Sequence, residues 1–308
     1  MPTSHDPSLP PLARGGIDRS ADERTDPELL ERLRADPDTA VIVVRDDAAR
    51  LAPGGGLARV NPAQAPAGAL WAFLGRDDAG RAHLLASAPS DGDGDPSDAP
   101  APDERWAQLR AAGGEMDAVE AGLFVEAVTL SRWLRGARFC GACGSEAEIT
   151  EAGWSRRCPA CGRTHFPRAD PAVIVAVVSE DGDRLLLGRN ALWGDRVLYS
   201  TFAGFVEAGE SLEAAVVREV REEAGVDVAA HAYQGSQAWP YPHSLMLGFR
   251  ARAREDLAAR ADGVEIVDVR WFTREEIRSA LRGEGEVRLP GPASIARQLI
   301  TQWCGEDT

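Results

Sequence analysis

The sequence predicts a mixed α/β protein with more than one domain, and three observations support this. The chain has 308 residues, which is long for a single domain and sufficient for two or three. Hydrophobic residues make up 44% of the chain, so a sizeable core can be buried. In the C-terminal half, runs of β-branched residues alternate with helical patterns, which is typical of layered α/β folds.

Charge and hydropathy exclude several classes of protein. The chain carries 49 acids against 34 bases, a net charge of −15, which disfavours a protein that coats nucleic acid. No apolar run approaches the ~18 residues of a membrane span. Residues 1–24 are polar and hold no apolar core of a secretory signal. We therefore expect a cytoplasmic protein that does not contact a membrane.

The N-terminal part divides into an extension and a domain. Residues 1–37 are rich in Pro, Asp and Arg, which predicts a loosely ordered extension. A mixed α+β domain is expected over 38–135, followed by two further domains at 136–168 and 169–308. Within the 38–135 domain, residues 87–103 are almost all small or acidic, which predicts a flexible loop. Strands are expected at 40–44, 70–75 and 82–86, and helices near 104–112 and 122–135.

Two cysteine pairs lie in the short, turn-rich segment 136–168. Cys140 and Cys143 form the first C-x-x-C pair, and Cys158 and Cys161 form the second, 14 residues further on. Four thiolates satisfy tetrahedral zinc and leave no open position for catalysis. We expect a zinc ribbon with one structural Zn²⁺ per chain. A redox dithiol is the alternative, although nothing around either pair resembles a thioredoxin fold.

The C-terminal domain, 169–308, carries the clearest alternation of elements. Gly225 is well suited to end its first helix, because the residue after a helix often has a positive φ. Strands are expected at 172–178, 184–187, 201–203, 244–253 and 264–273, and helices at 211–224, 274–282 and 292–303.

The helix at 211–224 carries acids on the same stripe as its apolar residues. At 100° per residue, Glu219, Glu222 and Glu223 continue the face begun by Leu212, Ala215 and Val216. Three carboxylates at this spacing repel one another unless a divalent cation neutralises them. Mg²⁺ or Mn²⁺ held in this way suits a phosphate substrate. A solvated charged face is the alternative.

Residues 204–226 resemble the Nudix box, G-x5-E-x7-R-E-U-x-E-E-x-G-U. The match covers every specified position, namely Gly204, Glu210, Arg218, Glu219, Val220, Glu222, Glu223, Gly225 and Val226. The resemblance implies a Nudix α/β/α sandwich and metal-dependent hydrolysis of a nucleoside diphosphate linked to another group. It also implies that Glu219, Glu222, Glu223 and the Ala203 carbonyl hold Mg²⁺ or Mn²⁺, and that Arg218 orients the carboxylates.

A second segment resembles the S-Q-P-W-P-F-P-x-S signature of the NAD(H) pyrophosphatase subfamily. It reads Ser236-Gln237-Ala238-Trp239-Pro240-Tyr241-Pro242-His243-Ser244, with Ala238 in place of Pro and Tyr241 in place of Phe. The Trp239 and Tyr241 rings offer flat faces to a planar base, while Gln237 and Ser244 offer hydrogen bonds. A plain loop that leads into a strand is the alternative.

The order of the domains also resembles that subfamily, which implies a homodimer. The resemblance implies that Phe166 contacts the partner's substrate and that Phe205 stacks on the nicotinamide. Glu265, expected in the strand that leads to Trp271, matches a further acid near the metals, with an exposed strand acid as the alternative. Glu222 or Glu265 is the expected base, and the sequence does not decide between them.

The implied reaction is hydrolysis of NADH or NAD⁺ to nicotinamide mononucleotide and AMP. Removal of an NAD cap from RNA 5′ ends breaks the same bond. Between Arg132 and Arg168 there are seven arginines and three acids, which is compatible with an RNA tail or with ordinary surface charge. The alternatives are a Nudix hydrolase of another substrate such as ADP-ribose, which the 236–244 segment disfavours, and a zinc-ribbon nucleic-acid-binding protein, which the intact carboxylates disfavour.

Overall fold

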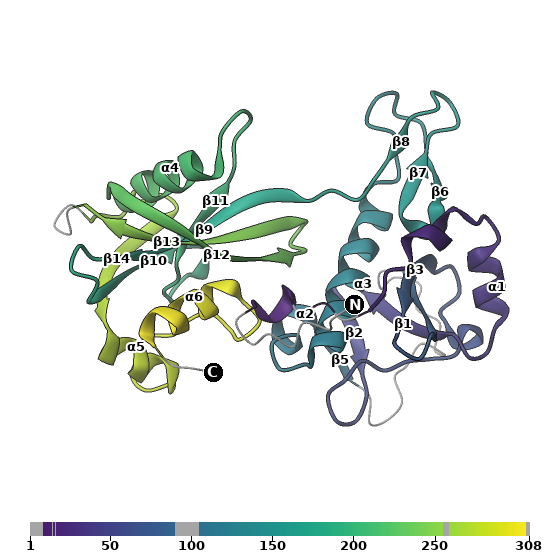
Figure 1. The fold of residues 1–308 in the computed structure, drawn as a ribbon, viewed down its shortest axis with the longest axis horizontal. Helices are drawn as coiled ribbons and strands as arrows, with labels where there is room; N and C mark the ends of the chain where they lie inside the picture. The colour runs from purple at the N-terminus through teal and green to yellow at the C-terminus, as the bar shows by residue number, and fades with distance from the viewer. Residues whose placement is uncertain (1–8, 14, 16, 90–104, 255–258, 306–308) are drawn as a thin grey trace. The chain divides into compact units, whose positions relative to one another are not determined.

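The computed structural model describes residues 9–13, 15, 17–89, 105–254 and 259–305, and it divides into two compact units (Figure 1). The first unit contains mainly Arg14–Ala169, together with Pro240–His243. The second contains Asp170–Trp239 and Ser244–Thr308, together with Pro7–Ala13. Within the described residues, every helix is too short or too polar to cross a lipid bilayer.

The first unit is built on a five-stranded sheet with the order β3-β4-β1-β2-β5. β1 and β4 are parallel and the other neighbours are antiparallel. Helix α3 packs on β1, β3 and β4, and its Phe124 side chain is fully buried. The bounds are β1 Ala40–Arg45, β2 Ala48–Leu51, β3 Leu70–Arg76, β4 Ala82–Ser87, β5 Arg105–Gln108, α1 Leu29–Ala35, α2 Leu109–Ala112 and α3 Ala118–Gly136.

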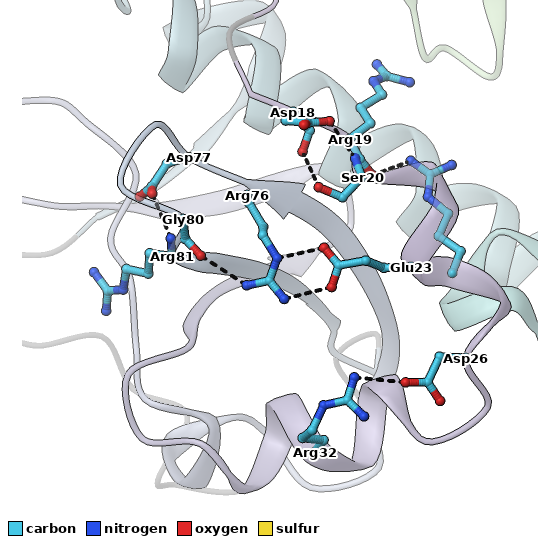
Figure 2. Close-up of polar contacts among 11 residues, drawn as sticks. Asp18, Arg19, Ser20, Glu23, Asp26, Arg32, Arg76, Asp77, Gly80 and Arg81 are labelled. Atoms are coloured by element: carbon cyan, nitrogen blue, oxygen red, sulfur yellow. Dashed lines mark hydrogen bonds and ion pairs between the residues drawn. The ribbon is translucent and has the colours of Figure 1, made fainter.

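The segment expected to be a loosely ordered extension is partly folded. Residues 21–25 form a 3-10 helix and 29–35 form α1, whose Leu29 and Leu33 are buried. Figure 2 shows both carboxylate oxygens of Glu23 accepting hydrogen bonds from the Arg76 guanidinium of β3, each at 2.7 Å. The composition of this segment is typical of disorder, but burial of Leu29 and Leu33 and the ion pair between Glu23 and Arg76 hold it against the sheet.

The cysteine-bearing segment forms a small antiparallel sheet in the order β6-β7-β8. Its strands are short, and they span Glu148–Thr150, Ser155–Arg157 and Thr164–His165. The Trp154 indole, next to β7, donates a 2.7 Å hydrogen bond to the Phe73 carbonyl of β3. The ribbon is therefore tied to the large sheet of its own unit.

The second unit is a sheet covered by helices on both faces. The strand order is β12-β13-β9-β10-β14, and β11 pairs with β9 (Figure 1). Only β13 and β9 run parallel. The bounds are β9 Asp170–Val178, β10 Arg184–Asn190, β11 Phe202–Phe205, β12 Val228–Trp239, β13 Ser244–Ala253, β14 Ile266–Thr273, α4 Leu212–Ala224, α5 Arg274–Leu281 and α6 Ile295–Cys304.

Strand β9 explains the two layers of core. Its side chains alternate between faces. Val173, Val175 and Val177 pack with residues of α4, whereas Ile174, Ala176 and Val178 pack with residues of α5 and α6. The expected α/β/α sandwich is confirmed.

Two segments have a secondary structure other than the one expected. Residues 105–108 form edge strand β5 instead of the start of a helix, because they pair with β2. Residues 228–239 form a long strand that was not expected, and its regular pattern is broken by register shifts after Ala229 and Tyr233. The loop expected over 87–103 lies largely outside the described residues.

Candidate active site

Helix α4 places two acids on its buried face and one on its edge. The Ser211 side chain caps its first turn by accepting a hydrogen bond from the Ala214 amide, and Gly225 ends it at a φ of 65°. Glu219 and Glu223 are buried, whereas 60% of the Glu222 side chain is exposed. The expected stripe of three inward acids is therefore split, since residues i and i+4 share a face more closely than residues i and i+3.

Glycine at position 204 is required by the position of the Glu219 carboxylate. A Cβ atom at Gly204 of β11 would lie 2.0 Å from Glu219 Oε1. The carboxylate thus lies directly against the backbone of β11. It is held beside Ala203, the preceding residue, whose carbonyl is the expected backbone ligand of a metal.

Arg218 connects the loop before α4 to two of the acids on the helix. Its guanidinium donates two 2.8 Å hydrogen bonds to Glu210, one of 2.8 Å to Glu219 and one of 3.0 Å to Glu222. A further bond reaches the Phe205 carbonyl. These bonds raise the pKa of Arg218, and they lower the pKa of Glu210 to about 2. Arg218 therefore contacts two of the acids to which the Nudix box assigns the metal.

Glu223 is a buried acid whose Oε2 has no hydrogen-bond partner in the described structure. Its pKa is raised to about 8, mainly by burial and also by the charges of Glu265 and Glu219. Burial also raises the pKa of Glu219. The donor set consists of oxygen atoms: the buried carboxylates of Glu219 and Glu223, the nearby Ala203 carbonyl and the carboxylate of Glu265. Oxygen ligands of this kind fit a hard divalent cation.

A pocket of about 200 Å³ opens beside Glu223 in the second unit. Ala203, Glu265 and Trp239 line it, and so do Asn190 and Trp193 at the end of β10. Glu265 lies just before β14 and not within the strand, and its Oε1 accepts a 3.4 Å hydrogen bond from Asn190 Nδ2. The pocket therefore combines acids with aromatic rings.

The four cysteines fit zinc by distance. Their Sγ atoms all lie within 4.8 Å of one another, and the pairs Cys140–Cys161 and Cys143–Cys158 are 3.6 and 3.5 Å apart. A tetrahedral ion about 2.3 Å from each sulfur requires sulfurs about 3.8 Å apart. No set of three or more acids in the described residues is gathered so closely.

The two cysteine knuckles have the same local structure. The amides of Gly144 and Gly162 donate to the carbonyls of Cys140 and Cys158, four residues earlier, and both glycines have a φ near 75°. His165 Nε2 lies 3.2 Å from Cys140 Sγ, as a residue that supports a metal ligand would. The ribbon is thus built around the four sulfurs.

Comparisons with known proteins agree with both sites. Residues 168–289 match the family model described as NUDIX domain, and residues 135–166 match the NADH pyrophosphatase zinc ribbon domain. The chain is 39% identical over 312 residues to a Mycobacterium tuberculosis protein named NAD-capped RNA hydrolase NudC, with 96% of this chain and 95% of that protein covered. The chain belongs to the NudC family of Nudix hydrolases. Proteins of the same name from Stutzerimonas stutzeri and Pseudomonas aeruginosa are 42% identical over 65% of this chain and 67% of their own length.

Residues 236–244, which resemble the NAD(H) pyrophosphatase signature, lie along the β12–β13 hairpin and are not a plain loop. Residues 236–239 end β12, and Ser244, which is buried, begins β13. Gln237 is also buried, and its Nε2 donates a 3.0 Å hydrogen bond to the Ala293 carbonyl. Ala238 pairs with Leu245, and Trp239 reaches the pocket.

The other residues expected to bind the substrate do not line the pocket beside Glu223. Pro240, Tyr241, Pro242 and His243 belong to the first unit, where the guanidinium groups of Arg110 and Arg132 each lie 5.7 Å from the centre of the Tyr241 ring. Phe166 follows β8 and is 59% exposed. Phe205 ends β11, is 53% exposed and is not part of the pocket lining.

Most residues that line this pocket were not among the site residues expected from the sequence, and three of them are polar or aromatic side chains of interest. Asn190 and Trp193 belong to no motif, although Asn190 caps the short 3-10 helix at 191–193, where its side chain accepts a hydrogen bond from Leu192. Ser294, the N-cap of α6, also lines the pocket. Serine is a common N-cap residue and could be recognised in the sequence, but only the fold shows that Ser294 lines the pocket.

Proposed function

We propose that the chain hydrolyses the pyrophosphate of NADH or NAD⁺ to nicotinamide mononucleotide and AMP, and removes NAD caps from RNA 5′ ends by the same reaction. The observation that carries the proposal is the buried carboxylate of Glu223, whose Oε2 has no hydrogen-bond partner, beside a pocket that Trp239 also lines. The carboxylates would bind the metal ions that neutralise a diphosphate, and the Trp239 indole offers a flat face on which a planar base can stack. The names of the relatives point to the same substrates.

Glu219, Glu222, Glu223 and the Ala203 carbonyl are the groups that would hold Mg²⁺ or Mn²⁺, with Glu265 as a further acid. The bound ions would neutralise the diphosphate oxygens and make a bound water more acidic. Arg218 fixes Glu219 and Glu222 so that they keep their orientation while substrate binds. Glu222 or Glu265, which are both exposed, accepts the proton of the attacking water.

Recognition of the nicotinamide side rests on rings and on hydrogen bonds. Trp239 and Phe205 stack on the base, and Gln237, held by the Ala293 carbonyl, offers its Oε1 to a polar edge. Ala238 and Ser244, which belong to the same unit as Trp239, shape the same subsite. Phe166 contacts the substrate of the partner subunit in a homodimer.

The zinc ribbon, 136–168, has a structural role between the N-terminal domain, 38–135, and the Nudix domain, 169–308. One Zn²⁺ per chain stabilises a segment too short to bury a core of its own. Four free thiols held for zinc are typical of a reducing compartment, so we place the protein in the cytoplasm.

The test is product analysis with Mn²⁺ across NADH, NAD⁺, ADP-ribose and NAD-capped RNA. We expect reduced nicotinamide mononucleotide from NADH and nicotinamide mononucleotide from NAD⁺ and NAD-capped RNA, together with AMP or a 5′-monophosphate RNA. The Glu219→Gln variant serves as the control for contaminating hydrolases. A preference for ADP-ribose over both dinucleotides would contradict the proposal while leaving a Nudix hydrolase in place.

A further inference from the structure

A second pocket, of about 350 Å³, lies wholly within the first unit and is rich in arginine. Arg135 from the last turn of α3, Arg138 just after that helix and Arg156 from β7 line it, and Glu146 is its one acidic lining residue. Leu70 of β3 also contributes to the wall. Three bases against one acid is the reverse of the chain as a whole, which has 49 acids and 34 bases.

Two of these arginines are fixed by uncharged acceptors. Arg156 is 4% exposed, and its terminal nitrogens donate to the Ala147 and Leu134 carbonyls. Arg135 donates to the Ser87 hydroxyl at 2.8 Å and to the Ser87 carbonyl. Arg156 Nε, which is buried, has no hydrogen-bond partner in the described structure.

The positive charge in this pocket is only partly neutralised, because three guanidinium groups and one carboxylate line it. Burial lowers the pKa of Arg135 and of Arg156, whereas the charge of Asp46 acts in the opposite direction on Arg135 and that of Glu146 on Arg156. Glu146 is also paired with Arg138 at 2.9 Å, and both of these side chains are exposed. A buried cation that is only partly neutralised is costly, so an anion that enters the pocket supplies the missing negative charge.

We propose that this pocket is a binding site for a phosphate-type oxyanion. Guanidinium groups bind phosphate through paired, charge-assisted hydrogen bonds, and backbone acceptors already hold two of these groups in fixed positions. The phosphate belongs to a free nucleotide or to the backbone of an RNA chain. The site does not depend on the proposed hydrolase activity, because it uses none of the residues of the pocket beside Glu223.

Three substitutions of exposed side chains test the site without disturbing the core. Arg138→Gln removes one positive charge from the lining, and Glu146→Gln removes the acid that opposes an anion. Arg157→Gln is the matched control, because Arg157 follows Arg156 on β7 and strand alternation directs it to the other face, where it is exposed. It removes the same charge as Arg138→Gln, but from a side chain outside the lining.

The first measurement is the affinity for inorganic phosphate, from calorimetry and thermal unfolding at constant ionic strength without added divalent metal. Arg138→Gln is expected to weaken binding by about five-fold or more and Glu146→Gln to tighten it, since each changes the local charge by one. Arg157→Gln is expected to match the wild type. Equal affinity in all four proteins, or equal losses in both arginine variants, would overturn the proposal.

The second measurement uses a 10-nucleotide oligoadenylate to identify the source of the phosphate. If the site binds an RNA backbone, Arg138→Gln weakens RNA binding and lowers the salt dependence by about 0.7 in the log–log slope, whereas Arg157→Gln does not. If RNA binding is unchanged while phosphate binding falls, the site takes a small phosphate ligand. NADH turnover is expected to be unchanged in all three variants, so failure of this site and failure of the hydrolase are separable.

Discussion

Replacing Glu223 by Gln should stabilise the metal-free protein at alkaline pH while abolishing its turnover. The carboxyl has an ordinary pKa of 4.5 and a pKa of about 8 in the fold, mainly because it is buried. A difference of roughly 3.5 units, at about 1.36 kcal/mol per unit, corresponds to roughly 5 kcal/mol of unfavourable charge burial at pH 9. An imperfectly bonded amide in its place costs about 1–3 kcal/mol. We therefore expect a net gain of roughly 2–4 kcal/mol.

The sign of the pH dependence follows from the raised pKa. Below pH 4.5 the carboxyl is protonated in both the folded and the unfolded chain, and its contribution to stability is fully present. That contribution is lost as the pH rises from about 4.5 to about 8, because the unfolded chain releases the proton first. Glutamine has no such transition. The stability of wild type should therefore fall over this range relative to that of Glu223→Gln.

The assay is urea unfolding of both proteins from pH 5 to pH 9 without added Mg²⁺ or Mn²⁺. Glu213→Gln is the control, because Glu213 is exposed on the same helix and its lowered pKa keeps it ionised throughout this range. Addition of Mn²⁺ at pH 8 should stabilise wild type more than Glu223→Gln. If the stability of wild type and that of Glu223→Gln changed with pH in parallel, the buried Glu223 carboxylate would not carry the charge cost that a bound cation offsets, and the reasoning would be refuted.

Three further predictions concern the carboxylate cradle, the ribbon and the base subsite. Gly204→Ala should displace the Glu219 carboxylate, since a Cβ atom would lie 2.0 Å from Oε1, and should lower kcat by about 10² with little change in the circular dichroism spectrum; near-normal kcat would show that the contact is unimportant. Metal analysis should find about one zinc per chain, and Cys143→Ser should lower both zinc content and Tm; zinc-free protein of unchanged Tm would exclude the site. Trp239→Ala and Phe205→Ala should each lower kcat/KM for NADH by about 5- to 150-fold and that for ADP-ribose much less, because about 1–3 kcal/mol of stacking is lost; equal losses on both substrates would remove these rings from nicotinamide recognition.

The parts of the site that the sequence predicted are those written in consecutive residues. The spacing of Glu219 and Glu223 along one helix places both on its buried face, and the two C-x-x-C pairs each form a local turn. A helical wheel has a resolution of about one residue, and this explains why Glu222 was expected inside but lies at the exposed edge.

The parts that the sequence did not predict depend on contacts between distant segments. Asn190 reaches Glu265, 75 residues away, only because β10 pairs with β14. Gln237 is fixed by the carbonyl of Ala293, which precedes α6. Leu29 is buried although it lies in a stretch whose composition is typical of disorder. None of these contacts has a local signature.

The most direct test of the central claim is the identity of the products formed from NADH with Mn²⁺, followed by liquid chromatography and mass spectrometry. We expect reduced nicotinamide mononucleotide and AMP in equal amounts, with Glu219→Gln as the inactive control. Release of free nicotinamide with ADP-ribose, or no product from NADH under conditions in which ADP-ribose is hydrolysed, would contradict it.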